Sequence, residues 1–514
     1  MTTQTIMGVS PRVYQFLVSI FASLGSLLYG YDLGVVAEVV AAPSFLAQFG
    51  DNSTKTGLVV SLFTVGAFFG AFWAGPCGDY LGRKWTIFIG GAIFILGGAV
   101  QTGAQDYSYM FGGRFVAGLG VGALIMIIPL YQAELAHPSI RGRITALQQF
   151  MLGVGNLIAA WVSYGTYISF EDDDSAQWRI GLGLQILPAL FLTSLILLFP
   201  ESPRWLIHHG RSEEGLVVLA KLHARGNDQD DFVQEEYNAI TAAVEYEKEH
   251  AAKSYAELFK TRSSFRRLIT ALSLQASVQM SGISAIQYYS PDIYGQIGIS
   301  GSDTFMFQGF NAIVALAAQF CCMLFIDRVG RRWTLIGGNL LNMVTFIIAT
   351  ALLASYPPGT STNRSAQEAF IAMTWLFNFS YSVACGPLSW IIPAEIFDTH
   401  TRSKGVSLAT ACSFAFNTLI GQVSPIALER IGWKYYILFV VCSGTNALWF
   451  WATLPETAKR PLEEMGPLFQ KMPWFVPGKS RISVQQLWGD EWRGSAGELG
   501  KAEEKEMKIE KAHK

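Results

Sequence analysis

The sequence predicts an all-α membrane protein, with twelve transmembrane helices in two pseudo-symmetric six-helix bundles and a small cytoplasmic helical insertion between them. Three observations lead to this fold class. Of the 514 residues, 51% are hydrophobic and only 15% are charged, whereas soluble domains carry about 25% charged residues. The apolar residues gather in stretches of about 20, the length that crosses a bilayer as a helix. Three short polar motifs also recur in the same order in both halves of the chain.

Twelve apolar stretches form the predicted spans. They cover residues 13–36, 57–77, 85–103, 108–131, 145–168 and 181–199 in the first half, and 266–290, 304–326, 334–354, 369–396, 405–425 and 434–454 in the second. The small residues at the start of the fourth span should let helix backbones approach closely; they are Gly112, Gly113, Gly118, Gly120 and Gly122.

These spans divide the chain into five expected parts. They are an N-terminal cytoplasmic segment (1–12), a first bundle (13–200), a cytoplasmic helical linker (201–265), a second bundle (266–455) and a cytoplasmic tail (456–514). The tail is rich in Glu and Lys near its end, so it is expected to be part helical and part disordered.

Each half carries the same three polar motifs between its spans. The matched pairs are Asp79-x2-Gly82-Arg83-Lys84 with Asp327-x2-Gly330-Arg331-Arg332, Glu134 and Arg141 with Glu395 and Arg402, and Pro200-Glu201-x2-Arg204 with Pro455-Glu456. Matched motifs in one order indicate a duplicated bundle. Duplicated bundles are a mark of secondary transporters, so the chain is expected to move a solute across a membrane.

Basic residues set the predicted orientation. They gather in the loops after spans two, four, eight and ten, and such residues favour the cytoplasmic side, which places both termini in the cytoplasm. The glycosylation sequons at Asn52 and Asn363 fall in loops one and nine, on the opposite side. The expected location is the plasma membrane.

Composition argues against several other classes of protein. A net charge of −2 argues against a nucleic-acid partner. The six cysteines lie within or beside apolar spans without metal-ligand spacing, so they are expected to be small core residues. No nucleophile–base pair or phosphate-binding loop appears, so neither an enzyme nor a cofactor or metal is expected. The first apolar run ends without a small-residue cleavage site, so no cleavable signal peptide is expected.

Two ionisable residues lie inside predicted spans, Asp32 in the first and Arg114 at the head of the fourth. A charge at the bilayer centre costs roughly 3 kcal/mol on insertion scales. The two side chains are therefore expected to face each other or water.

Four motifs together resemble the sugar porter family (sugar/H⁺ symporters) of the major facilitator superfamily. They are Gly75-x3-Asp79-x2-Gly82-Arg83-Lys84, Gly113-Arg114 with its glycine-rich continuation, Pro200-Glu201-Ser202-Pro203-Arg204 and Gly386-Pro387-x2-Trp390. The resemblance covers residues 13–460. It implies the major facilitator fold, with two six-helix bundles around a central cavity that opens alternately to each side.

The resemblance also implies roles for the charged residues. In proton-coupled members an Asp at the position of Asp32 partners an Arg at the position of Arg114, so protonation of Asp32 is expected to couple transport to a proton. A static buried ion pair is the alternative. The charged cytoplasmic residues are expected to form gating pairs, with Asp79 beside Arg83 and with Glu134 or Glu201 beside Arg141 or Arg204. The corresponding residues of the second half are Asp327, Arg331, Glu395 and Arg402.

A sugar needs many hydrogen-bonding partners, and polar residues on the spans supply candidates. The expected substrate-binding residues are Gln149, Asn156, Gln275, Gln279, Ser284, Trp390 and Asn417, of which Gln149, Gln279 and Trp390 match sugar-contacting positions of the family. The second half departs from the family pattern, because shorter groups stand at Val278, Ser284, Ala315, Ser382 and Ser413. The site is therefore expected to be wider than a standard glucose site.

The sequence thus leads to a proton-coupled transporter of a hexose or pentose, or of a larger glycoside, that works as a monomer with sugar, protons and the lipid bilayer as partners. A facilitative porter of a polyol or a quinate-like acid stays open, although a carboxylate substrate would call for a further cation in the cavity. A sugar sensor of the same fold also stays open. Sensors of this kind usually have a longer cytoplasmic tail.

Overall fold

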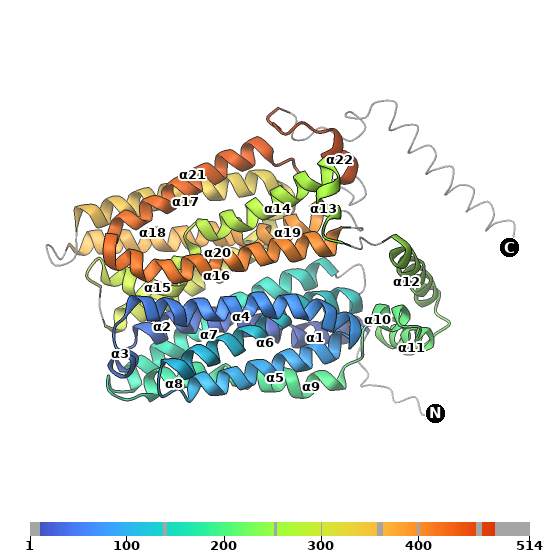
Figure 1. Cartoon of the computed structure of the whole chain (residues 1–514), viewed down its shortest axis with the longest axis horizontal. Helices are drawn as coiled ribbons and strands as arrows, with labels where there is room; N and C mark the ends of the chain where they lie inside the picture. Colours follow the sequence, from blue (N-terminus) through green and yellow to red (C-terminus); the bar gives the residue numbers. More distant parts are fainter. Residues whose placement is uncertain are drawn as a thin grey trace.

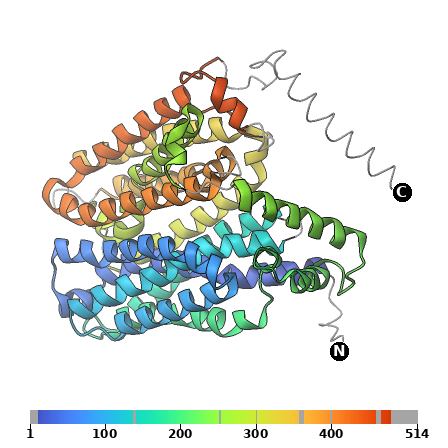
Figure 2. The same cartoon turned by 45° about the vertical axis from the view of Figure 1, so that its right-hand side comes forward.

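The structure is a computed structural model that describes residues 11–136, 141–250, 254–299, 301–356, 363–397, 401–458 and 465–478. Every regular element within these ranges is helical. Figure 1 shows two layers of long helices, the first half of the chain in blue to cyan and the second in green-yellow to red. A group of short helices projects from one end of both layers (Figure 2).

The first layer holds six long segments and one short helix. They are α1 (Pro11–Ala22) with α2 (Leu24–Ala41), the short α3 (Pro43–Phe49), α4 (Ser53–Tyr80), α5 (Arg83–Thr102), α6 (Tyr107–Leu135), α7 (Arg141–Ser169), and α8 (Ala176–Leu184) with α9 (Ile186–Leu195) and the 3₁₀ turn η1 (Ile196–Leu198). The expected linker contains α10 (Pro203–His208), α11 (Ser212–His223), α12 (Asp231–His250) and α13 (Glu257–Lys260).

The second layer repeats this arrangement. It holds α14 (Arg262–Met280) with α15 (Ile283–Gly295), α16 (Ser302–Val329), α17 (Arg331–Ser355), α18 (Arg364–Val383) with α19 (Cys385–Ile396), α20 (Arg402–Ile431), the turn η2 (Gly432–Lys434) and α21 (Tyr435–Thr453). The short α22 (Met465–Lys471) follows and packs on α14, where the buried Arg266 donates to the Met472 carbonyl oxygen at 2.5 Å.

Each predicted span coincides with a helix or a broken pair of helices. Nine segments of the described chain are long and apolar enough to cross a membrane, and the last of them, Lys404–Thr453, contains both α20 and α21. The predicted fifth and seventh spans are helical but are not among the nine. Both are unusually polar: α7 carries several amide side chains, and α14 begins with three arginines before the break at Gly282. Polar helices of this kind fit positions inside a bundle, where side chains face protein or water.

Two spans of the second half are broken at glycines or prolines. Gly282, between α14 and α15, has φ +95°, and a Cβ there would lie 2.8 Å from the Phe439 ring, so glycine is required for both conformation and space. The tenth predicted span breaks at Ala384, two residues before Gly386 and three before Pro387. Broken helices leave backbone groups free to line a cavity.

Glycines bring α4 and α6 into backbone contact. A Cβ at Gly118 would lie 2.1 Å from the Phe63 carbonyl oxygen, and one at Gly122 would lie 2.1 Å from that of Ala67. Gly113 and Gly120 pack equally closely on α5. The prediction of close approach is wrong for Gly112, which faces open space, because it points away from both neighbouring helices.

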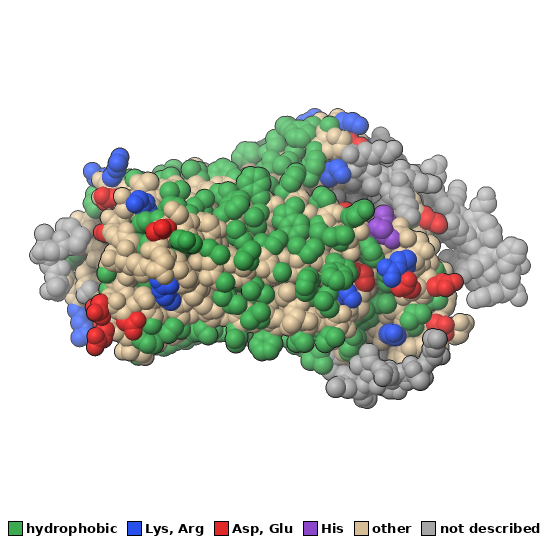
Figure 3. Space-filling view, turned by 60° about the horizontal axis from the view of Figure 1, so that its bottom comes forward, with side chains coloured by type: hydrophobic (Ala, Val, Ile, Leu, Met, Phe, Trp, Pro, Cys, Tyr) green, Lys and Arg blue, Asp and Glu red, His purple; other side chains and the backbone are tan. Residues whose placement is uncertain are grey.

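Apolar side chains cover the middle of the molecule, and charged ones gather at its two ends (Figure 3). We call the end that bears α10–α12 the insertion end. The opposite end, which holds the exposed sequon residues Asn52 and Asn363, is the sequon end. Their side chains cap α4 and α18, where they accept backbone N–H bonds from Lys55 and from Ser365. Glycosylation at these asparagines stays a prediction.

The apolar core differs between the two ends. At the sequon end one continuous cluster combines α2 and α4 of the first half with α15, α17, α18, α20 and α21 of the second. At the insertion end each half has its own cluster, apart from Phe414, which joins the cluster of the first half. The two halves are therefore packed together most extensively at the sequon end.

Candidate functional site

An ion pair lies within the first bundle, where three helices meet. Arg114 Nη1 of α6 donates to Asp32 Oδ1 of α2 at 2.6 Å, and both side chains are 1% exposed. Arg114 Nε also donates to the Val59 carbonyl oxygen at 2.9 Å, and its guanidinium carbon lies 4.5 Å from the centre of the Phe63 ring. Asp32 Oδ2 has no hydrogen-bond partner among the described residues. This oxygen is therefore available to a proton.

Close backbone packing fixes the position of this pair. A Cβ at Gly30 would lie 1.9 Å from the Leu152 carbonyl oxygen, so α2 packs against α7 two residues before Asp32. Gly113 packs on the backbone of Gln101 in α5, directly before Arg114. The glycines beside each charged residue therefore hold α2 close against α7 and α6 close against α5.

A hydrogen-bonded network occupies the second bundle. Gln279 Nε2 donates to Ser413 Oγ at 3.1 Å, and Gln279 Oε1 accepts from Ser284 Oγ at 2.6 Å and from Asn417 Nδ2 at 3.2 Å. Tyr288 Oη donates to Asn417 Oδ1 at 2.9 Å. The structure thus brings three predicted substrate residues into one network. In this conformation a hydroxyl of a ligand would have to displace an internal bond.

The other predicted substrate residues divide into two groups. Gln149, Asn156 and Trp390 are half-buried and make no hydrogen bond to the described residues, so their polar groups are available to a ligand. Gln275 is different, because it is buried and donates to the Ser389 carbonyl oxygen at 2.8 Å. It ties α14 to α19 and is less accessible than the sequence suggested.

One of the shorter residues behind the expected wider site packs against apolar side chains in this conformation. Val278 is 3% exposed and lies in the apolar core of the second half, and the wider site stays a prediction. It points away from Gln279 because consecutive helical residues are rotated by about 100°.

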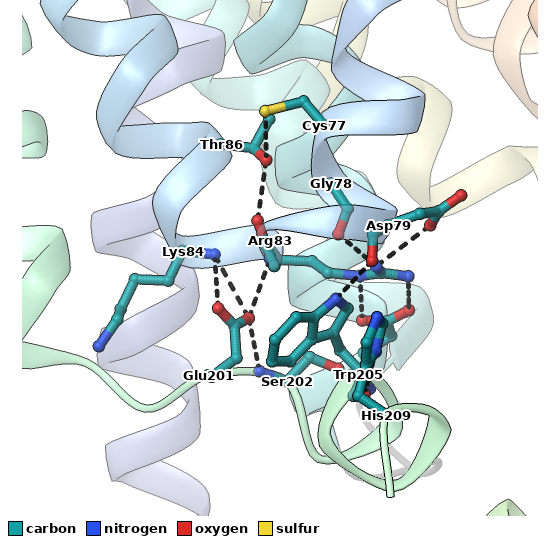
Figure 4. A network of polar contacts seen from close by, with 12 residues as sticks. Cys77, Gly78, Asp79, Arg83, Lys84, Thr86, Glu201, Ser202, Trp205 and His209 are labelled. Atoms are coloured by element: carbon teal, nitrogen blue, oxygen red, sulfur yellow. Dashed lines mark hydrogen bonds and ion pairs between the residues drawn. The ribbon is translucent and has the colours of Figure 1, made fainter. Parts of the chain in front are cut away.

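The predicted gating residues of the first half form a network at the insertion end. Arg83 donates to both oxygens of Glu134, at 3.0 and 3.1 Å, and to Asp79 Oδ1 at 3.2 Å. Figure 4 shows the Glu201 carboxylate turned towards the start of α5, where it accepts from the backbone N–H groups of Arg83 and Lys84 at 3.0 and 3.2 Å. A carboxylate at a helix N-terminus also suits the helix dipole.

The second half repeats this network. Arg331 donates to Glu395 Oε1 at 2.9 Å, and Glu456 accepts from the backbone N–H groups of Arg331 and Arg332 at 2.8 and 3.3 Å. The repeated motifs of the sequence thus correspond to a repeated structure: an arginine at a helix start, a carboxylate beneath it and a second carboxylate from a neighbouring helix.

The structure corrects the expected pairing within these motifs. Glu134 pairs with Arg83, and Glu201 accepts from the backbone N–H groups of Arg83 and Lys84, and the sequence predicted neither contact. The reason is geometric: Arg83 starts α5 directly beside the end of α6, where Glu134 lies. The side chains of Arg141 and Asp327 lie outside the described residues, and Arg402 donates weakly to the Phe397 carbonyl oxygen at 3.4 Å. These described pairs stay within one half.

Burial gives Glu201 an unusual protonation behaviour. It raises the pKa of the Glu201 carboxyl above its usual value, and the N–H donors and the Arg83 charge oppose that rise. Acidification at the insertion end would therefore protonate Glu201 before an ordinary exposed glutamate, and a protonated carboxyl is a weaker acceptor for the start of α5.

We expect Glu134→Gln to lower the stability of the folded protein more than Asp79→Asn does. The Glu134 side chain is 5% exposed and that of Asp79 is 78% exposed, although both contact Arg83. Loss of a charge-assisted buried bond costs about 1.5–3 kcal/mol, whereas an exposed pair contributes about 0–1 kcal/mol. Thermal unfolding of both variants in one detergent measures the difference. Equal stability of the two would show that the buried bonds to Glu134 contribute little.

One buried acid was missed at the sequence level. Glu38 of α2 is 1% exposed, yet the predicted first span ended at residue 36 and so excluded it. The helix continues to Ala41, and a lone acid within that apolar stretch is the signal that identifies it. Asn378 was missed too; it donates to Asn311 Oδ1 at 3.0 Å.

Comparisons with known proteins agree with this geometry. The sequence profile of the family described as "Sugar (and other) transporter" matches residues 18–469. The MFS-type transporter criB of Aspergillus cristatus is 33% identical over 88% of this chain and 92% of its own length. The quinate permease of Emericella nidulans is 31% identical over 98% of this chain and 96% of its own.

Solved structures show the same fold. The proton:xylose symporter XylE bound to 6-bromo-6-deoxy-D-glucose superimposes with a TM-score of 0.73 at 23% identity, covering 89% of this chain and 99% of that one. An inward open conformation of XylE from E. coli also gives 0.73, covering 88% and 100%. Together with the family match, these likenesses identify a multi-pass membrane transporter with the major facilitator fold and exclude an enzyme. The chain belongs to the family of sugar and other transporters.

Proposed function

We propose that this protein takes up a neutral polyhydroxylated solute of the sugar class together with a proton, by alternating access between the two bundles. The observation that carries the proposal is the buried Asp32–Arg114 pair at 2.6 Å, in which one carboxylate oxygen has no partner among the described residues. A proton on Asp32 would remove its charge and weaken its bond to Arg114. The position of α2 against α6 would then depend on protonation.

The packing of the two halves supports a state closed at the sequon end. Ser61 Oγ of α4 donates to Gln422 Oε1 of α20 at 2.8 Å, and the hydroxyls of Thr64 and Thr418 lie 2.7 Å apart. The joint apolar cluster lies at the same end. The basic loops favour an insertion end on the cytoplasmic side of the membrane. If that membrane is the plasma membrane, this conformation is closed to the outside of the cell. The motif networks would then keep each half rigid while the halves move.

Amides and one aromatic ring favour a sugar-like substrate. Gln149 and Asn156 lie seven residues apart on α7 and so share a face of that helix, and Trp390 lies in α19, which follows the helix break at Ala384. Amides bond hydroxyls, and an aromatic ring packs on the C–H face of a sugar ring. These residues and the Gln279 network together offer a polyhydroxylated ring hydrogen-bonding groups from both halves of the chain.

A quinate-like acid is the second candidate, because relatives that cover nearly the whole chain are described as quinate permeases. Its carboxylate needs a cation, and Arg114 is bound to Asp32 in this conformation. A proton on Asp32 would release Arg114 Nη1, so an acid and a proton could bind together.

An uptake panel in a transport-deficient host decides between the two. Labelled pentoses, hexoses, a glycoside, a polyol and quinate are compared with and without a protonophore. Saturable uptake of a sugar that quinate does not inhibit, and that the protonophore abolishes, is expected. Quinate uptake alone would favour the acid, and uptake unaffected by the protonophore would contradict proton coupling. Substrate binding without uptake would favour a sensor.

We expect Gln279→Ala to weaken substrate binding several-fold. Its amide joins three side chains, and loss of a hydrogen bond costs about 0.5–1.5 kcal/mol, or more where partners are stranded. Trp390→Ala should have a similar effect through lost ring contact. Asn446→Ala is the control, because Asn446 donates to the Ser277 carbonyl oxygen at 3.2 Å from α21, outside the network. If Gln279→Ala and Trp390→Ala have the same apparent affinity as the control, these two residues do not bind the substrate.

A further inference from the structure

Glu38 is a buried carboxyl that the proposed mechanism does not use. It lies on α2, 1% exposed, and neither of its oxygens has a hydrogen-bond partner among the described residues. The Ser163 hydroxyl of α7 is the polar group that lies beside it, and this hydroxyl has no other partner among the described residues. An ionised carboxylate without a partner costs several kcal/mol in such a place.

Among the described residues around Glu38, no cation pairs with its carboxyl. Tyr31 on the same helix donates to the Gly181 carbonyl oxygen at 2.9 Å. On the helices that pack against α2, the charged residues that lie towards this end are already engaged or exposed: Arg114 binds Asp32, Arg179 of α8 donates to the carbonyl oxygens of Thr102 and Ala104, and Asp292 of α15 is exposed. The titratable hydroxyls on α7 and α15 are those of Tyr164, Tyr167, Tyr288, Tyr289 and Tyr294.

A pocket at the sequon end lies one helical turn from this carboxyl. The pocket measures about 520 Å³ and is lined by Ala41 of α2, Tyr167 of α7 and Asp292 of α15, among others. Ala41 follows Glu38 by three residues and Tyr167 follows Ser163 by four, so on each helix the two share a face. Glu38 and Ser163 are thus each one helical turn from a residue that lines the pocket. The exposed Asp292 shows that water reaches the pocket.

Glu38 also lies between this pocket and the ion pair. Asp32 precedes it by six residues on α2, about 9 Å along the helix axis. Of the two acids on α2, Glu38 is nearer the sequon end, and Asp32 is the deeper one.

We propose that Glu38 is a second proton-binding site, through which protons from water at the sequon end reach the Asp32 region. The proposal rests on the proton-coupled function above. When the sequon end opens, water enters through the pocket, and the Glu38 carboxyl exchanges its proton with that water. When the end closes, as in this conformation, the buried carboxyl keeps the proton. The net change is one proton bound from the external solution.

The test compares pH profiles of purified, full-length protein in liposomes. Substrate uptake driven by a proton gradient is measured against external pH for wild type, Glu38→Gln and Glu38→Asp, with Glu171→Gln as an exposed control carboxyl at the same end. Glu38→Gln cannot titrate, so the midpoint of its profile should move by about one pH unit or more, while counterflow exchange continues. Glu38→Asp should keep a titrating profile, and Glu171→Gln should match wild type.

The outcomes separate this inference from the proposed function. If a protonophore does not change uptake by the wild-type protein, proton coupling is overturned, and the role of Glu38 is overturned with it. A protonophore-sensitive wild type whose pH profile Glu38→Gln leaves unchanged would overturn only the second site. If Glu38→Gln does not fold, Ser163→Ala carries the test, because loss of the facing hydroxyl should also shift the midpoint; an unchanged profile in that variant would overturn the proposal.

Discussion

Asp32→Asn should abolish accumulation of substrate against its gradient and leave counterflow exchange measurable. The asparagine keeps the shape of the side chain and can still bond Arg114, but it cannot bind or release a proton. The cycle could then still exchange substrate across the membrane, but the proton gradient could no longer drive it. The variant also leaves the Arg114 charge without a counter-charge, and a buried pair that loses one partner costs about 3–5 kcal/mol.

The measurement must separate coupling from folding. Transport by Asp32→Asn is therefore expressed per amount of folded protein at the membrane, in both accumulation and counterflow assays. Asp79→Asn is the matched control, since it makes the same chemical change on a side chain that is 78% exposed. Uphill accumulation by Asp32→Asn would show that coupling does not pass through this carboxyl. A static ion pair predicts instead that both assays fall together.

Gly118→Ala should cause a large loss of stability for the addition of one methyl group. The new Cβ would lie 2.1 Å from the Phe63 carbonyl oxygen and 3.0 Å from the Ala67 nitrogen. These are backbone atoms, so no side-chain rotation relieves the clash, and α4 and α6 must separate. Overpacking of this kind typically costs about 1–3 kcal/mol, and occasionally more.

Gly112→Ala on the same helix is the control. A Cβ there meets nothing within 4 Å, and alanine favours a helix over glycine by about 1 kcal/mol. Thermal unfolding in one detergent should therefore place Gly118→Ala well below wild type and Gly112→Ala at or above it. Equal unfolding temperatures for the two variants would mean that the α4–α6 contact yields easily. Transport should fall with stability in Gly118→Ala, because Arg114 lies one turn away.

Several features followed from the sequence because their causes are local. Apolar stretches of bilayer length predicted the spans, since a buried backbone must satisfy its own hydrogen bonds as a helix. The cost of a charge in an apolar stretch predicted that Asp32 and Arg114 would face each other or water, and in the structure they face each other at 2.6 Å. The repeated motifs predicted a repeated structure, which the matched networks of Arg83 and Arg331 display. Their parts in transport remain proposals.

Other features depend on how the helices pack, and the sequence did not reveal them. The partner of Arg83 is Glu134, 51 residues away, because the start of α5 meets the end of α6, and sequence spacing carries no record of that contact. Val278 and Gln279 are neighbours in the chain, yet one packs in the core and the other joins a polar network. Whether a polar group is available to a ligand depends on its partners, and Gln275 is already bonded to α19.

The sequence by itself determined the fold class, the membrane and the charged residues that need a partner, because each follows from the free energy of placing a residue type in lipid. Only the tertiary structure decided which partner each charge takes, that the halves pack together at the sequon end, and that Glu38 is buried. Those features depend on the rotation and contact of whole helices. Small residues distributed along the chain set that packing collectively, so no local motif reveals it.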